Sequence, residues 1–304
     1  MKFPAGCVKV HRMPTSETWA TPVELLVLGA IWGAAFMFMR VAVPAFGAMP
    51  LVELRLVLGT LVLLPFLWRD RRHFMPSVWL RVTLVGAVNA AIPFALFAWA
   101  ADRAPAGIGA IANSTTAMFA ALVAVFFFGE KLQARRMLGL AVGFAGVVVL
   151  ASGKTDGASI TGAAIAGTLG ALFYGVGINL VRRYLDDLPP YAGACANLLS
   201  ASIVCAPLAI ATWRPGPVPA EAWWAAVALG VLCSGVAFVM YYRLIYRIGA
   251  PRAATVAYLI PLFGVFWAWL LLDEAITSTM TLACLLILAG VALSQQRSAP
   301  RNDS

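Results

Sequence analysis

Ten apolar segments, each long enough to cross a lipid bilayer, account for most of the 304 residues of this chain. About 20 consecutive apolar residues cross the hydrocarbon core as a helix. We place the spans near residues 22–43, 50–68, 79–101, 105–128, 136–152, 160–181, 189–211, 222–245, 249–272 and 277–295. Charged residues make up 12% of the chain, against about 25% in a soluble domain. We therefore predict an all-α membrane protein with ten transmembrane helices.

The second half of the chain repeats the plan of the first at a displacement of 144 residues. Glu130 falls on Glu274 and Phe119 falls on Phe263. Because each repeat holds five helices, an odd number, the second must enter the membrane from the opposite side. Inverted repeats are typical of secondary transporters, whose substrate site lies at the midplane between the halves. The expected organisation is an N-terminal cytoplasmic segment over 1–21, repeats over 22–152 and 153–295, and a C-terminal cytoplasmic tail over 296–304.

The positive residues predict the orientation, since cytoplasmic loops carry an excess of Lys and Arg. With the N-terminus in the cytoplasm, 17 of the 22 Lys and Arg residues fall in cytoplasmic segments. Three fall in outer loops (Arg103, Lys154 and Arg214), and Arg40 and Arg55 fall inside helices. This asymmetry favours ten spans with both termini in the cytoplasm. The net charge of +9 therefore concerns topology and lipid headgroups, and no nucleic-acid partner is expected.

Three local motifs resemble a known family. They are FFFGEKL at 126–132, GFAGVVVL at 143–150 and PLVELRL at 50–56, where Arg55 stands at the family's usual arginine position. With the tandem five-helix halves, they resemble the ten-helix branch of the drug/metabolite transporter superfamily, built from two EamA domains. The second half departs from the pattern, because Asp273 stands where the first half has Gly129. The resemblance implies export of amino acids or other small metabolites across a bacterial inner membrane. It also implies a central cavity lined by helices 1, 3, 4, 6, 8 and 9.

Polar and aromatic residues deep in the spans are the candidates for substrate binding. Asn113 and Thr116 lie three apart on one face of the fourth span and offer an amide and a hydroxyl to a zwitterion. Ser114 and Thr115 between them suit helix packing as well, because such hydroxyls also bond back to their own helix. Packing between helices is the alternative for the aromatic residues. The candidate substrate-binding residues are Trp32, Phe36, Asn89, Asn113, Thr116, Tyr174, Tyr241 and Tyr258.

Ionisable groups within spans are expensive, which makes each of them a functional hypothesis. Here they are Arg40, Glu53 and Arg55, whereas Glu24 reads as the cap of the first helix. One interpretation is an outer structural ion pair between Arg40 and Glu53. The other is an outer gate, with Arg55 attracting anions. No Asp or Glu falls in the middle third of a span, which favours facilitated exchange over strict proton antiport.

Two prolines interrupt predicted spans. Pro93 lies in the third span and Pro261 in the ninth, and each removes one intrahelical hydrogen bond. A flexing kink beside the site and a static kink are both compatible with the sequence.

Several other functions find no support. The cysteines (Cys7, Cys195, Cys205, Cys233 and Cys284) form no C-x-x-C pair, and neither histidine lies in a span, so no metal site is predicted. No P-loop or other cofactor motif occurs. An intramembrane enzyme is a competing hypothesis, but no catalytic dyad supports it. We expect a monomer in the lipid bilayer that carries a small molecule without a cofactor, with drugs and nucleosides as alternative substrates.

Overall fold

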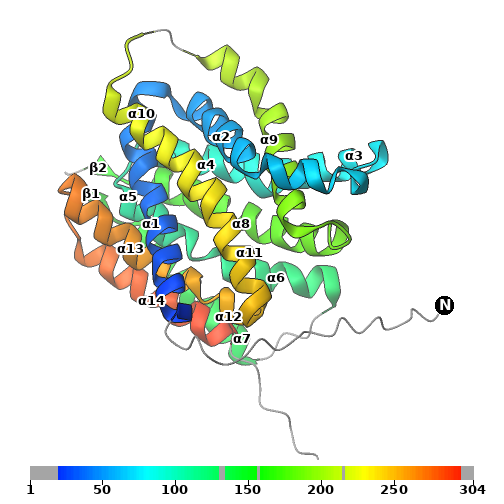
Figure 1. Ribbon diagram of the computed structural model, residues 1–304. Coiled ribbons are helices and arrows are strands. Elements are labelled where there is room, and N and C mark those ends of the chain that lie inside the picture. The colour runs from blue at the N-terminus through cyan, green and yellow to red at the C-terminus, as the bar shows by residue number, and fades with distance from the viewer. Residues whose placement is uncertain (1–19, 130–133, 156–157, 214–215, 296–304) are drawn as a thin grey trace, which may run out of the picture.

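The computed structural model describes residues 20–129, 134–155, 158–213 and 216–295 (Figure 1). The expected terminal segments up to residue 19 and from residue 296, together with Glu130, lie outside these ranges. Eight helical units in the described ranges are long and apolar enough to cross a membrane, and two shorter apolar helices complete ten. Their bounds agree with the predicted spans to within a few residues, so the predicted all-α, ten-helix architecture is confirmed.

The uninterrupted spans are the first, second, fifth, sixth, seventh and tenth. They are α1 (Ala20–Phe46), α2 (Ala48–Arg69), α7 (Ala134–Ala151), α8 (Thr161–Tyr184), α9 (Pro190–Thr212) and α14 (Ser278–Gln295). A short helix η1 (Arg71–His73) follows α2, and strands β1 (Lys154–Thr155) and β2 (Ala158–Ser159) form a small hairpin before α8.

The other four spans are broken; at the 144-residue displacement the breaks of the third and eighth spans coincide, and those of the fourth and ninth lie four residues apart. The third span is α3 (Pro76–Gly86), a π-helical η2 (Ala87–Ala91) and α4 (Ile92–Ala101), and the eighth is α10 (Ala220–Val227), a π-helical η3 (Ala228–Val236) and α11 (Ala237–Ile248). The fourth is α5 (Ala106–Asn113) and α6 (Thr116–Phe128), and the ninth is α12 (Ala250–Ala253) and α13 (Val256–Leu272). Displacing η2 by 144 residues places it inside η3. Breaks of this kind inside a membrane free backbone groups and concentrate at functional sites.

The first helix of the chain packs mainly on the second repeat. Helix α1 lies against α13 and α10 and runs beside α11, as Figure 1 shows. The contact with α13 is close, since a Cβ built on Gly33 would lie 2.7 Å from the Cβ of Phe263 and 2.8 Å from the nitrogen of Gly264. Small residues permit such approach between helices in a membrane, where packing drives association. The two repeats therefore interlock through α1.

The prolines lie beside these breaks. Pro93 is the second residue of α4, directly after η2, and Pro261 lies inside α13, a few residues after the break at Ala254 and Thr255. Both prolines are buried. Proline at the second position of α4 is compatible with a preceding π turn, because its missing N–H leaves the preceding carbonyls free to bond elsewhere.

The fourth and ninth spans end in the same left-handed conformation despite their different residues. Gly129 has φ 63° after α6, and Asp273 has φ 53° after α13. A side chain in this region costs about 1–2 kcal/mol, least for Asn and Asp. A Cβ on Gly129 would meet nothing within 4 Å, so only the backbone conformation opposes it.

We therefore expect Gly129→Ala to destabilise the protein by about 1 kcal/mol and Asp273→Gly to leave it unchanged or slightly more stable. Thermal unfolding of the detergent-solubilised protein measures both changes. If Gly129→Ala has the melting temperature of the unmodified protein, the left-handed conformation of residue 129 is contradicted.

Candidate functional site

A buried arginine lies where the two repeats meet. Arg55 of α2 is only 8% exposed, and its Nε donates a hydrogen bond of 2.8 Å to Ser234 Oγ of η3. The guanidinium carbon stacks 3.6 Å from the ring centroid of Phe94 on α4. One terminal nitrogen lies 3.9 Å from the sulfur of Met39 on α1. Three other helical elements, from both repeats, therefore contact this cation on α2.

Aromatic rings extend from Arg55 as a continuous wall. Tyr174 of α8 packs edge-on against Phe94, with centroids 6.1 Å apart, and stacks on Phe97 at 5.8 Å. Phe97 in turn meets Phe36 of α1 edge-on at 5.6 Å. The predicted residues Phe36 and Tyr174 thus lie in one layer with Arg55.

Trp32 ties α1 to the π-helical segment of the second repeat. Its indole nitrogen donates to the backbone oxygen of Cys233 in η3 at 3.1 Å, and its ring lies 5.1 Å from that of Tyr241 on α11. Trp32 therefore contacts η3 at Cys233, the residue before Ser234, and α11 at Tyr241.

Asn113 and Thr116 flank the break between α5 and α6. The Thr116 hydroxyl lies 3.5 Å from Asn113 Oδ1, and both side chains are half-buried. Ser114 and Thr115 donate to Ile111 and Ala112 of their own helix at 2.5 and 2.7 Å. The packing interpretation therefore suits Ser114 and Thr115, and Asn113 and Thr116 keep polar atoms free of the backbone ladder.

Helix α5 touches the aromatic wall. A Cβ on Gly109 would lie 2.9 Å from the Phe36 ring. Asn113 follows Gly109 by four residues, which places it on the same face of the helix.

Two other predicted residues lie apart from this layer. Asn89 of η2 packs against Gly177 of α8 and donates to Asn197 Oδ1 of α9 at a long 3.5 Å. Tyr258 of α13 packs against a separate hydrophobic cluster that includes Ile108 and Met280. The structure therefore does not bring Asn89 and Tyr258 beside Arg55.

The expected ion pair between Arg40 and Glu53 is not formed. Arg40 Nε lies 3.6 Å from Glu274 Oε1, and the same carboxylate accepts a 2.8 Å hydrogen bond from the Ala106 amide at the start of α5. Glu53 accepts a 2.5 Å hydrogen bond from Ser202 of α9. Helix α1 directs Arg40 toward the start of α5, and α2 directs Glu53 toward α9, so the two charges diverge.

The opposite end of α1 is held by a second ion pair. Arg247 of α11 donates to both carboxylate oxygens of Glu24, at 2.9 and 2.7 Å, and Arg243 lies 3.9 Å away. The interpretation of Glu24 as a helix cap is therefore wrong. Helix α1 already begins at Ala20, so Glu24 lies inside the helix. The Glu24 carboxylate instead joins the first helix to the second repeat. Each end of α1 is thus held by a charge pair.

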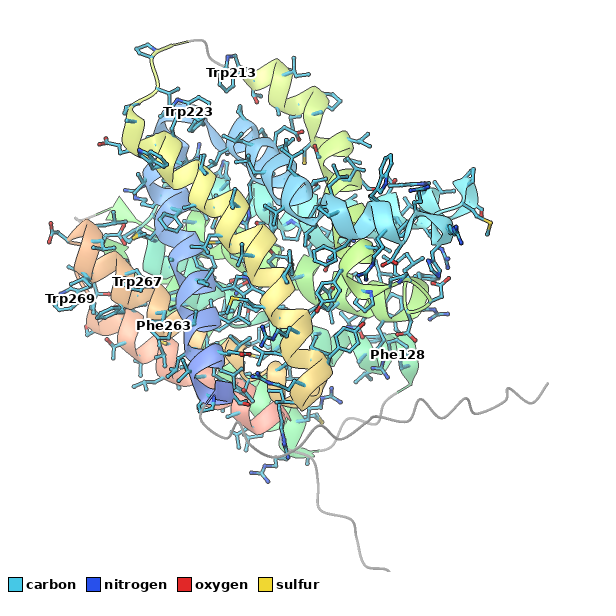
Figure 2. The ribbon with its side chains drawn as sticks, viewed as in Figure 1. Phe128, Trp213, Trp223, Phe263, Trp267 and Trp269 are labelled. Carbon is cyan, nitrogen blue, oxygen red and sulfur yellow. The ribbon has the colours of Figure 1, made fainter. Side chains whose placement is uncertain are left out.

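Two pockets open on the flank of the bundle rather than at Arg55. The first, of about 470 Å³, is lined by Glu53, Trp213 and Trp223 among other residues, and Figure 2 shows both tryptophans at one end of the molecule. Phe46 joins them, with ring centroids 6.3 and 4.9 Å away. The second, of about 440 Å³, lies between α2, α4 and α8. The Trp267 indole nitrogen donates to the backbone oxygen of Ala30 in α1 at 3.0 Å, whereas Trp269 is exposed on the flank of α13 (Figure 2). Such aromatic residues are typical of the ends of spans.

Sequence reasoning missed several of these residues. Phe94, Phe97 and Ser234 lie beside Arg55 or Tyr174, and only the hydroxyl of Ser234 inside an apolar run was a usable signal. Among the described residues, no cluster of three or more His, Cys, Asp or Glu could hold a metal ion.

Proteins of similar sequence match this chain over most of its length. A 26% identical relative covers 90% of this chain and 96% of its own length; it is an "Uncharacterized transporter" of Archaeoglobus fulgidus. A "Probable terminal-alkyne amino-acid exporter" of Streptantibioticus cattleyicolor is 26% identical over 92% of this chain and 95% of its own. A "Probable amino-acid metabolite efflux pump" of Escherichia coli is 24% identical over 90% of this chain and 93% of its own.

The fold also has a solved counterpart. A crystal structure described only as that of a protein superposes with a TM-score of 0.62 at 20% identity, covering 90% of this chain and 97% of its own. The model of the EamA-like transporter family matches residues 22–152 and 161–295, one match in each five-helix half. This chain is a multi-span membrane protein that belongs to the EamA-like transporter family.

Proposed function

We propose that this protein is a secondary exporter of amino acids or closely related small metabolites in a bacterial inner membrane. Transport proceeds by alternating access around the layer of Arg55, Tyr174 and Phe36, with both termini in the cytoplasm. The protein works as a monomer and uses no cofactor.

The observation that carries this proposal is the site between the repeats. Four spans are broken, the third and eighth at corresponding places, and a buried cation and an aromatic wall lie where α2 and α4 meet η3 and α8. Two relatives are named as an amino-acid exporter and an amino-acid metabolite efflux pump, which supports the substrate class. Both features fit a carrier whose ligand is small and partly apolar.

Alternating access also suits the two charge pairs of α1. The Arg40–Glu274 pair and the Glu24–Arg247 pair hold opposite ends of the helix against other elements. A carrier of this design releases one pair when it opens to one side and keeps the other. Residues at the ends of elements then absorb the motion.

Uptake into proteoliposomes tests the proposal. The purified protein is reconstituted and offered a panel of labelled amino acids, with and without an imposed pH gradient. Saturable uptake supports a carrier, and dependence on the gradient points to Glu53 as the residue to neutralise next. A panel without any amino-acid uptake contradicts the substrate class, and drugs and nucleosides then replace amino acids in the same assay.

We expect Asn113→Leu to lower amino-acid uptake at least about tenfold, because leucine removes a hydrogen-bonding amide worth about 1.5 kcal/mol or more toward a charged ligand. Ser114→Ala is the matched control. Its hydroxyl bonds only to Ile111 of its own helix, so its loss should leave uptake unchanged. Equal uptake by Asn113→Leu and the unmodified protein, with both folded, removes Asn113 from the site.

A further inference from the structure

The terminal nitrogens of Arg55 lack a strong acceptor. A guanidinium carries five N–H donors and stays charged in proteins. Within the described residues, Ser234 Oγ is the oxygen that Arg55 hydrogen-bonds, through Nε, and the contact of a terminal nitrogen is the weakly accepting sulfur of Met39 at 3.9 Å. A buried charge is costly unless it is paired and hydrogen-bonded. Arg55 therefore lies in the membrane with most of its hydrogen-bonding capacity unused.

The carboxylates that could neutralise Arg55 are engaged elsewhere. Glu53, two residues earlier on the same helix, points to α9, where Ser202 donates to it. Glu274 binds Arg40 and the Ala106 amide. Glu24 binds Arg247. In the part of the chain that the structure describes, no carboxylate forms an ion pair with Arg55. The described residues thus place a cation at the interface of the repeats without a counter-ion among them.

We propose that the counter-ion is the ligand, and that Arg55 binds the carboxylate of a small amphipathic acid whose apolar or aromatic body lies against Tyr174 and Phe36. The binding step stands on the geometry of Arg55 alone. The identification of the bound acid as the transported molecule rests on the export function proposed above.

The stacking of Arg55 on Phe94 favours this chemistry. The ring occupies one face of the planar guanidinium at 3.6 Å, which leaves the N–H groups to point outward in the guanidinium plane. In-plane N–H groups match a carboxylate with two parallel hydrogen bonds, a geometry that lysine cannot reproduce. The aromatic wall begins at the same ring, because Phe94 meets Tyr174, and Tyr174 stacks on Phe97. A charged head and an apolar body therefore find neighbouring surfaces.

The π-helical turn fixes Ser234 as an acceptor. Its hydroxyl donates to the backbone oxygen of Leu229, five residues earlier, at 3.3 Å. With its only proton engaged, the Ser234 oxygen can only accept, and it accepts from Nε of Arg55. This bond orients the guanidinium and leaves its terminal nitrogens for the ligand. At the 144-residue displacement, Arg55 corresponds to Leu199 and Ser234 corresponds to Ala90. Neither Leu199 nor Ala90 has a polar side chain, so the repeat does not produce a second copy of this pair.

Matched pairs of probes test the proposal directly. Binding of L-phenylalanine and L-phenylalaninamide, and of phenylacetate and phenylacetamide, is measured by thermal stabilisation of the full-length protein in detergent. Within each pair only the carboxylate differs. We expect the carboxylate member to bind roughly tenfold or more tightly, and this preference to disappear in Arg55→Gln. Preferential binding of either amide, no binding by any probe, or a preference that survives in Arg55→Gln overturns the proposal.

Two further variants keep the test decisive if Arg55→Gln does not fold. Arg55→Lys keeps the charge without the planar fork, so the preference should remain but shrink. Arg103→Gln is the control, because Arg103 is exposed, stacks on Trp99 and pairs with Asp102 outside the site. An equal loss of preference in Arg103→Gln would overturn the assignment to Arg55.

Transport of the same probes separates the two proposals. Carboxylate binding that depends on Arg55, without transport of any probe, retains this inference and contradicts export of such acids. Uptake of amino acids and their amides at equal rates retains a carrier and overturns the role of Arg55.

Discussion

Gly290→Val is expected to prevent α7 and α14 from packing against each other and to cause the largest loss of stability of any substitution considered. A Cβ on Gly290 would lie 2.5 Å from the oxygen of Gly139 and 2.5 Å from the nitrogen of Gly143. These are backbone atoms, which cannot rotate away as a side chain can. Overpacking of side chains costs typically 1–3 kcal/mol, and a clash with backbone belongs at or above the upper end.

The approach is reciprocal. A Cβ on Gly139 would lie 2.7 Å from the oxygen of Gly290 and 2.7 Å from the nitrogen of Ser294. Helices α7 and α14 are the fifth helices of their repeats, so the clash would act on the contact that joins the ends of both halves. Gly139 and Gly143, four residues apart on one face of α7, both lie at this close contact with Gly290.

Size-exclusion chromatography of the heated, detergent-solubilised protein measures this effect as the fraction that stays monodisperse. Gly162→Val is the matched control, because the nearest atom to a Cβ on Gly162 is Trp99 Cη2 at an ordinary 3.7 Å. If Gly290→Val and Gly162→Val keep the same monodisperse fraction after heating, α7 and α14 do not touch in the membrane as they do in this structure.

Glu274→Ala is the second change with a large expected effect. The carboxylate is 13% exposed and accepts the amide of Ala106 at 2.8 Å, so its removal leaves the first N–H of α5 without that acceptor. A buried donor without a partner costs about 1–3 kcal/mol. Glu274→Gln keeps an acceptor for Ala106 and loses only the charge, which separates the hydrogen bond from the attraction to Arg40. We expect Ala to lower the melting temperature, and Gln to preserve it in acid and to raise it slightly at neutral pH.

The pH dependence of this pair follows from the position of Glu274 in the turn between α13 and α14. Burial raises the pKa of Glu274 above its ordinary value of 4.5, and the Ala106 amide, the Arg40 charge and the Gly107 amide oppose that rise without cancelling it. A carboxyl whose pKa is higher in the folded than in the unfolded protein contributes stability below its unfolded pKa and loses it as pH rises through the folded pKa. The ionised carboxylate is thus retained at a net cost.

Glu274→Gln should therefore gain stability relative to the unmodified protein as the pH rises from about 4 to 8, and the two should converge in acid. Melting curves across this range measure the difference. A constant difference, or one that grows in acid, would contradict the raised pKa. Acidification should also loosen the Arg40–Glu274 pair, because a neutral carboxyl does not attract a guanidinium.

The sequence by itself determined the ten spans, the repeat and the family. Span count depends on local composition and on the thickness of a bilayer, and both can be read from 18 to 25 letters at a time. The equivalence of Glu130 with Glu274 needed only the 144-residue displacement. Phe36 and Tyr174 could be proposed from the sequence because aromatic residues so deep in a span suggest a role beyond the membrane interface.

Only the tertiary structure decided which side chains meet. Arg55 and Ser234 lie 179 residues apart, and their contact depends on the rotation of α2 and η3 about their own axes. A π turn changes that rotation for every residue after it, and no residue pattern in 87–91 or 228–236 predicted a π turn. The same is true of Arg40. The sequence suggested Glu53 as its partner, whereas the structure pairs it with Glu274. Hydropathy specifies which segments enter the membrane, whereas helix phase and packing between distant segments specify the site.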